Sequence, residues 1–119
     1  MMDSSISRIL RKVPRENAFY FFTSIGNYTG ENAASLEEFV RKVKEVDAKS
    51  LEFHLYRGDF EKWVDETLED KELAEKIRSL KSLSLSGNSL QNQLYFIVSK
   101  RYEKLKGELS VKHMESKSI

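Results

Sequence analysis

A glycine–aspartate break inside the stretch Ser50–Trp63, SLEFHLYRGDFEKW, constrains the fold more than any other part of this chain. Glycine readily adopts the left-handed conformation that ends many helices, so Gly58 predicts the end of a short helix that Ser50 caps. A carboxylate at the next position favours a helix start, so we expect Asp59 to cap a second helix. The stretch therefore predicts a corner between two helices.

The first half of that stretch also fits a strand. Leu51, Phe53 and Leu55 alternate with other residues at the period of a strand that faces a core. A helix instead places Leu51, Leu55 and Gly58 on one side. We prefer the helix because Ser50 and Gly58 supply a start signal and a stop signal at its ends.

The clearest helix begins at Ser35. Ser35 and Glu38 have the spacing of a capping box, in which each side chain bonds a backbone amide near the other residue. An apolar stripe at helical spacing follows, made of Leu36, Phe39, Val40, Val43 and Val46.

Two further helices are expected in the second half of the chain. Asp70 has the position of an N-cap in front of an apolar stripe that continues to Leu80. The longest helix begins at Ser89, after a serine-rich connection, and its apolar period ends near Gly107 or Leu109.

The N-terminal part of the chain is less regular. Residues 4–13 fit a short helix, which Pro14 should end because proline disfavours a helical residue before it. The aromatic run at 18–23 is too short to show a period, and it fits either a buried strand or an extended segment laid across helices. The stretch 25–33, IGNYTGENA, has the glycines and asparagines of a loop.

These assignments predict an all-α fold, a compact bundle of about five helices with at most one short N-terminal extended segment. The 119 residues are enough for one domain with its own core. We divide the chain into an N-terminal helix or arm at 1–13, a single helical domain at 14–109 and a flexible tail at 110–119.

Charge is distributed unevenly along the chain. Residues 1–75 carry 11 basic and 16 acidic residues, whereas residues 76–119 carry 9 basic and 3 acidic residues. A basic C-terminal helix fits a solvated helix face, and it also fits an anionic partner. The chain has no Cys and no apolar run of about 18 residues, so we expect no disulfide and no membrane contact, and we expect a cytoplasmic protein.

His54, Arg57 and Asp59 are the best candidates for chemistry. On a helix, His54 and Arg57 lie one turn apart, and Asp59 follows just beyond the break. A carboxylate that orients a histidine ring is common at a general base. No nucleophile, metal motif or second acid accompanies them, so we favour a structural role for His54 and predict no catalytic residues.

Aromatic residues form a second candidate site, a platform for a sugar ring or a nucleobase made of Trp63, Tyr20, Tyr28 and Tyr56. Aromatic residues at helical spacing more often belong to a core, and Trp63 shares its stripe with Phe60 and Val64. The binding residues predicted from both arguments are His54, Arg57, Asp59, Trp63 and Tyr56.

Other site classes find less support. No spacing of histidines, carboxylates or glycines matches a metal or phosphate motif, so no metal and no cofactor are predicted. The C-terminal helix carries Lys100, Arg101, Lys104 and Lys106, but no helix-turn-helix glycine accompanies them, and we do not expect nucleic-acid binding. Its apolar residues suffice for a core face and a partner face, which suggests a homo-oligomer through this helix.

Three segments resemble a family of small archaeal proteins of unknown function: FYFFTSIGNYTGENAASLEEF, KEVDAKSLEFHLYRGDFEKWV and KELAEKI. The most specific phrase is SLEFHLYRGDFEKW. Related phrases occur in small modules attached to larger enzymes, some of them carbohydrate-active. The resemblance implies an accessory or regulatory module, and it implies no catalytic residues.

We therefore expect a small helical binding, regulatory or accessory module with an unidentified protein or carbohydrate partner. One alternative is a hydrolase or transferase that acts on sugars or phosphoesters through His54 and Asp59. The other is a nucleic-acid-binding protein that works through the basic C-terminal helix.

Overall fold

The computed structural model describes the backbone of residues 2–117 and the side chains of residues 5–110. Its helices, in chain order, are α1 (Met2–Leu10), η1 (Arg15–Asn17), α2 (Leu36–Glu45), α3 (Ala48–Arg57), α4 (Asp59–Trp63), η2 (Val64–Leu68), α5 (Lys71–Ser79), η3 (Leu80–Leu83) and α6 (Gly87–Lys117). Two strands, β1 (Phe19–Ser24) and β2 (Asn27–Ala33), form an antiparallel hairpin between η1 and α2.

The hairpin makes this an α+β fold, so the predicted all-α class is wrong. β1 occupies the aromatic run that the sequence left open, and β2 occupies the stretch predicted as a loop. Most β2 side chains face solvent, so no hydrophobic alternation marks this strand in the sequence. Gly26, with a φ of 84°, forms the hairpin turn, and Gly30, with a φ of 90°, lies within β2.

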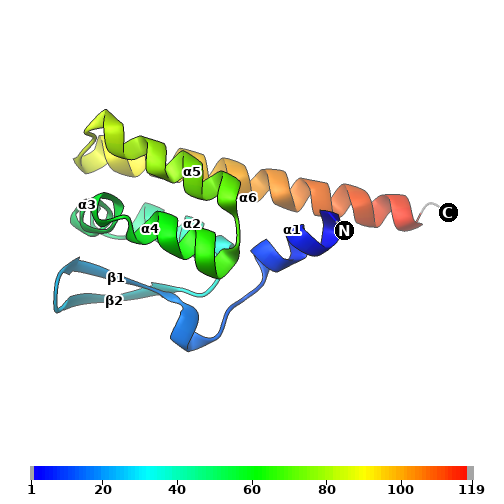
Figure 1. The fold of residues 1–119 in the computed structure, drawn as a ribbon, viewed down its shortest axis with the longest axis horizontal. Helices are drawn as coiled ribbons and strands as arrows, with labels where there is room; N and C mark the ends of the chain where they lie inside the picture. Colours follow the sequence, from blue (N-terminus) through cyan, green and yellow to red (C-terminus); the bar gives the residue numbers. More distant parts are fainter. Residues whose placement is uncertain (1, 118–119) are drawn as a thin grey trace.

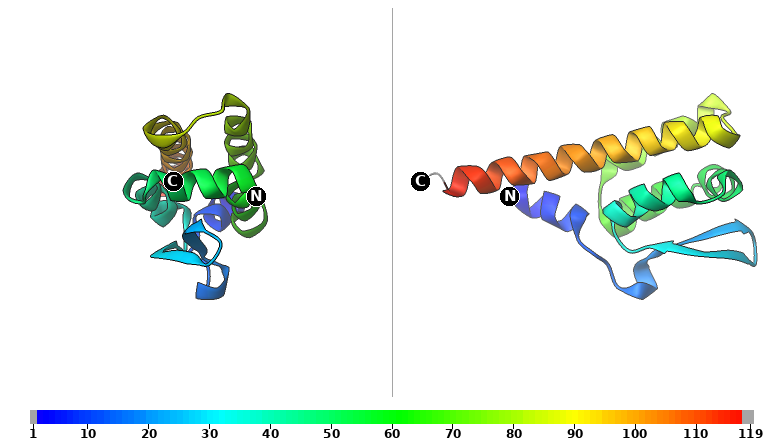
Figure 2. Two further views of the ribbon diagram at one scale, coloured as in Figure 1. Left: turned by 90° about the vertical axis from the view of Figure 1, so that its left-hand side faces the viewer. Right: turned by 180° about the vertical axis from the view of Figure 1, so that it is seen from behind.

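The elements form three layers, which Figures 1 and 2 show from several sides. α5 and α6 make one outer layer, α2, α3 and α4 make the middle, and the hairpin covers the other side. α6 is the longest element and extends past the body of the protein, with α1 beside it. The described helices include none that is long and apolar enough to cross a membrane.

The two faces of β1 have different surroundings. Phe19 and Phe21 point inward and are buried, whereas Tyr20 and Phe22 on the other face are partly exposed. The Phe19 ring lies 5.0 Å from Phe60 and 5.8 Å from Trp63, measured between ring centroids. The hairpin is thus attached to the helices through an aromatic cluster, for which such edge-to-face and tilted contacts are favourable.

Two of the predicted helix caps are confirmed. The Ser35 hydroxyl accepts a 3.1 Å bond from the Glu38 amide, while the Glu38 carboxylate accepts from the amide of Ala34, one residue before the expected partner. Asp70 caps α5 by accepting from the Leu73 amide at 3.1 Å.

The corner at Gly58 is confirmed, although its two caps differ from the prediction. Gly58 ends α3 in the left-handed region with a φ of 82°. α3 begins at Ala48 and is capped by Asp47, so the predicted Ser50 cap is wrong, and Ser50 is buried inside the helix. Asp59 is the first residue of α4 but makes no capping bond, because its carboxylate contacts His54 and Arg57 instead.

The end of α6 also differs from expectation. α6 continues to Lys117, so the end predicted near Gly107 or Leu109 is too early. The glycine at 107 carries no φ in the left-handed region, and the helix passes through it. α1 (Met2–Leu10) contributes Ile6 and Ile9 to the same buried core as the rest of the described chain.

Candidate functional site

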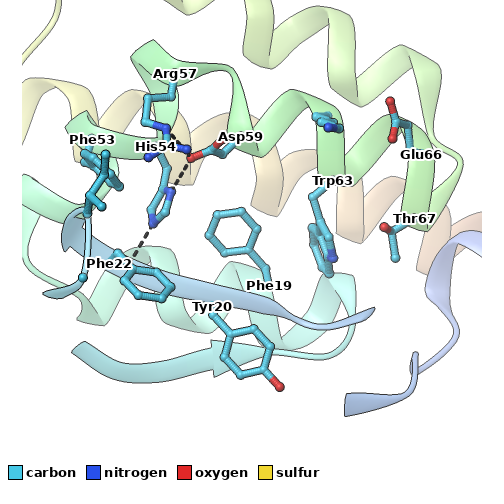
Figure 3. A pocket seen from close by; sticks show the side chains of 13 residues that line it. Phe19, Tyr20, Phe22, Phe53, His54, Arg57, Asp59, Trp63, Glu66 and Thr67 are labelled. Atoms are coloured by element: carbon cyan, nitrogen blue, oxygen red, sulfur yellow. Dashed lines mark hydrogen bonds and ion pairs between the residues drawn. The ribbon is translucent and has the colours of Figure 1, made fainter. Parts of the chain in front are cut away.

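A groove of about 580 Å³ lies between β1 and the corner of α3 and α4 (Figure 3). We call it the corner groove. Its lining comes from β1 (Phe19, Tyr20, Phe22), the hairpin turn (Ile25, Gly26), α3 (Phe53, His54, Arg57), α4 (Asp59, Lys62, Trp63) and η2 (Glu66, Thr67). Four of the five predicted binding residues therefore share one surface, and the exception is Tyr56.

His54 joins the hairpin to the corner through both of its ring nitrogens. The Phe22 backbone N–H donates a 2.8 Å bond to Nε2, and Nδ1 lies 2.8 Å from the Asp59 carboxylate. A backbone N–H can only donate, so Nε2 has no proton and Nδ1 carries it. His54 is therefore a neutral imidazole that donates to Asp59 and accepts from β1.

Burial keeps this imidazole neutral. Only 4% of the His54 surface is exposed, and desolvation lowers the pKa of His54 against the opposing effect of the Asp59 carboxylate. Both ring nitrogens are already bonded, and neither is open toward the groove. A general base needs an accessible lone pair, and the lone pair of Nε2 is already used by the Phe22 amide.

Asp59 is shared between two partners at this end of the groove. Its Oδ2 accepts from His54 and lies 3.3 Å from Nε of Arg57. The Arg57 guanidinium also lies over the Phe53 ring, 4.7 Å from its centroid, in a cation–π arrangement. Half of the Arg57 side chain is exposed, so its remaining donors reach the groove surface.

Trp63 forms part of the groove wall near its middle (Figure 3). Its indole N–H donates a 2.8 Å bond to the carbonyl of Asn17, and 8% of its surface is exposed. The sequence suggested both a core role and a site role for Trp63, and the same ring has both positions. One part of the ring packs on Phe19, and another part lines the groove.

The predicted four-residue aromatic platform does not assemble. Tyr20 and Trp63 line the groove, but Tyr28 lies against Tyr20 and Phe22 on the other strand. Tyr56 lies elsewhere, because its hydroxyl donates to the carbonyl of Leu85 at 2.5 Å. Tyr56 thus fastens α3 to the connection before α6.

Sequence reasoning missed the hairpin half of the groove. Phe22 and Ile25 line the groove from the hairpin, and neither was predicted as a site residue; Phe53, which lines it from α3, was not predicted either. The available signal was the alternation within FYFF, which places Phe19 and Phe21 on one strand face and leaves Tyr20 and Phe22 on the other. The alternation predicts that Tyr20 and Phe22 share a face only if this segment is first assigned as a strand.

The basic C-terminal helix is used partly for internal contacts. Arg101 is largely buried and pairs with the buried carboxylate of Asp70, with Nε 2.8 Å from Oδ2. Lys100 lies over the Phe96 ring at 5.6 Å, and Lys106 lies over Tyr102 at the same distance. Part of the charge that suggested nucleic-acid binding therefore stabilises the packing of α6.

The part of the chain that the structure describes contains no cluster of side chains suited to bind a metal ion. No group of three His, Asp or Glu side chains there is placed to hold an ion. The corner groove presents aromatic walls, a guanidinium, two carboxylates and the ammonium group of Lys62.

Comparison with known proteins identifies a family but no function. No curated protein and no solved structure matches the chain. A family model described as a family of unknown function, DUF5752, matches residues 14–117, which include the hairpin, the corner and α6. The chain belongs to this family.

Proposed function

We propose that this chain is a non-catalytic interaction module whose working surface is the corner groove. The observation that carries the proposal is an aromatic groove whose apolar surface continues onto the hairpin. Ile25 at the turn is 85% exposed, and Tyr28 in β2 is 46% exposed. A concave apolar site continuous with exposed apolar side chains is typical of a surface that binds a partner.

The geometry at His54 supports binding over catalysis. A hydrolase that used His54 and Asp59 would need Nε2 to take a proton from a nucleophile. That nitrogen accepts the Phe22 amide, and the ring is buried beneath the groove surface. His54 and Asp59 therefore serve to fix β1 against the corner and so to shape the groove.

The extent of the apolar surface favours a protein as the partner. The groove itself has the volume of a small-molecule site. Ile25 and Tyr28 extend the apolar surface beyond it, along a hairpin that a ligand seated inside the groove would leave uncovered. A partner that fills the groove and also covers the hairpin would bury both parts.

The anionic dye 8-anilinonaphthalene-1-sulfonate, whose aromatic rings bind apolar surfaces, tests whether the groove binds an apolar ligand. Trp63 is the only tryptophan, so energy transfer from its indole reports dye bound beside it. We expect saturable transfer in the native protein and a loss of affinity of about tenfold or more in Phe22→Asp, which places a charge among the apolar walls. Leu83→Asp is the matched control, because Leu83 is 58% exposed and does not line the groove.

Two results would contradict the proposal. Dye binding could be equally strong in native protein, Phe22→Asp and Leu83→Asp, or Leu83→Asp could weaken it as much as Phe22→Asp. In either case the apolar surface would lie elsewhere.

A finer proposal concerns carbohydrate. The resemblance to accessory modules of carbohydrate-active enzymes suggests a sugar as an alternative occupant, since aromatic rings pack on sugar rings while Arg57 and Asp59 can bond hydroxyl groups. Titration with maltotriose and cellotriose, followed by Trp63 emission, tests it. A saturable shift that Phe22→Asp removes would support this role, and an unchanged spectrum with both sugars would remove it.

A further inference from the structure

The apolar side chains of α6 leave little for a partner. Leu90, Leu94 and Leu105 are buried in the protein's own core, and Ile97 and Tyr102 pack against that core. In the described part of α6, the remaining exposed large apolar side chain is Phe96, which lies beneath Lys100. Within residues 87–110, Phe96 is therefore the large apolar side chain that this helix could offer to the interface suggested by the sequence.

The corner groove and the hairpin turn offer a different surface. Ile25 is a protruding apolar side chain, and the groove beside it is a concave apolar site. A two-fold interface joins the same surface of two copies, so it needs a projection and a complementary hollow on one face. This face carries both.

The charges at the rim are also self-complementary. Lys62 and Glu66 are exposed residues one helical turn apart on the rim of the groove. Within the described residues, neither takes part in a hydrogen bond or ion pair with another side chain. A two-fold axis over the groove would bring Lys62 of one copy towards Glu66 of the other and repeat the pair on the opposite side.

We propose that the partner of the corner groove is a second copy of this chain. In the resulting two-fold dimer, Ile25 of each copy enters the groove of the other, and Lys62 pairs with Glu66 across the axis. The inference rests on the proposed function and names the occupant of that same site. Each groove is completed by a side chain from the other copy.

Sedimentation velocity over a wide range of protein concentration tests this dimer. Native protein should dimerise as its concentration rises. Ile25→Asp should raise the dissociation constant about tenfold or more, because it removes an apolar side chain from the interface and introduces a charge there. Leu83→Asp, also an exposed apolar residue changed to a carboxylate but outside the groove, should dimerise as the native protein does.

Charge exchange tests the orientation of the two copies. Lys62→Glu and Glu66→Lys should each weaken the dimer, since each places like charges across the axis. The double variant restores opposite charges and should recover most of the native affinity. Circular dichroism of each variant checks that the helices are retained.

Several outcomes would overturn the dimer. They are a native protein that stays monomeric at every concentration, a dimer that Ile25→Asp leaves intact, equal losses in Ile25→Asp and Leu83→Asp, and a double charge variant no better than the single ones. The dye experiment separates this failure from failure of the proposed function. A monomer that still binds the dye in a Phe22-dependent way keeps the groove as a binding surface and excludes only the second copy as its occupant.

Discussion

His54 is the residue that most clearly links the sequence to the shape of the groove. Its side chain is almost fully buried, and it bonds the backbone of β1 on one side and the Asp59 carboxylate on the other. A buried polar group needs such partners, because an unsatisfied one costs roughly 1–3 kcal/mol. The same two bonds that satisfy the ring hold the hairpin at a fixed distance from the corner.

The burial of His54 predicts a specific pH dependence of stability. Because the pKa of His54 is lowered in the folded protein, the unfolded chain binds more protons than the folded one as the pH falls below the ordinary histidine pKa of about 6.5. The free energy of unfolding should be highest above that pH and should fall as the solution becomes acidic. Denaturation in urea at about pH 7.5 and about pH 5.5 measures the loss.

His54→Gln provides the control for this prediction, since glutamine offers a carbonyl acceptor and an amide donor but does not titrate. The variant should lose less stability between the two pH values than the native protein. An equal loss in both proteins would show that His54 contributes nothing to the pH dependence.

At the residue scale, the sequence predicted the local grouping around Gly58 but not the contact with the hairpin. His54, Arg57 and Asp59 do lie together, as their spacing around Gly58 predicts. The second partner of the His54 ring is the backbone amide of Phe22, 32 residues earlier in the chain. Such a contact depends on how the hairpin packs, and no local pattern in the sequence indicates it.

At the scale of elements, Gly58 sets the angle between α3 and α4. Its φ of 82° lies in the region that glycine adopts without strain. A Cβ added there would meet the Lys81 ammonium at 3.6 Å, an ordinary contact, so the effect of a side chain at this position comes from the backbone alone. The predicted helix break therefore has a conformational cause.

Gly58→Ala should destabilise the protein by about 1–2 kcal/mol, the typical penalty for a left-handed residue with a Cβ. Gly107→Ala is the matched control, because Gly107 lies within α6 with open space around it and should gain up to about 1 kcal/mol from helix propensity. Urea denaturation measures both. Equal effects of the same sign at the two positions would contradict the assigned conformations.

The β-hairpin shows why the fold class was not predictable at this scale. β1 alternates between buried and partly exposed residues over only four aromatic positions, and β2 faces solvent along most of its length. Hydrophobic periodicity detects elements that bury a face, so a short strand and an exposed strand both escape it. The helices α2 and α5 were predicted correctly because each has a capping residue and a buried apolar stripe.

At the scale of the whole molecule, one continuous core joins all layers. It includes Ile9 from α1, Phe21 from β1, Leu55 from α3 and Leu105 from α6. The N-terminal segment, which sequence reasoning left as a helix or an arm, is therefore part of the packed structure. The segment has few apolar residues, so its sequence does not show whether the helix packs. The contacts of those residues with the core show that it does.

Ile9→Ala tests this assignment of α1. The side chain is 7% exposed, so the substitution should cost about 2–4 kcal/mol of unfolding free energy through lost burial and an internal cavity. Leu83→Ala, at a position that is 58% exposed, should change stability by no more than about 0.5 kcal/mol. An Ile9 effect as small as the Leu83 effect would mean that α1 does not pack against the core.

His54 is a neutral imidazole that links β1 to the corner and so shapes the corner groove. Nitrogen-15 NMR of the histidine ring measures its tautomer and its titration directly. We predict a ring protonated on Nδ1, with Nε2 as an acceptor, that remains neutral below the ordinary histidine pKa. A ring protonated on Nε2, or one that titrates at or above the ordinary pKa, would contradict the account.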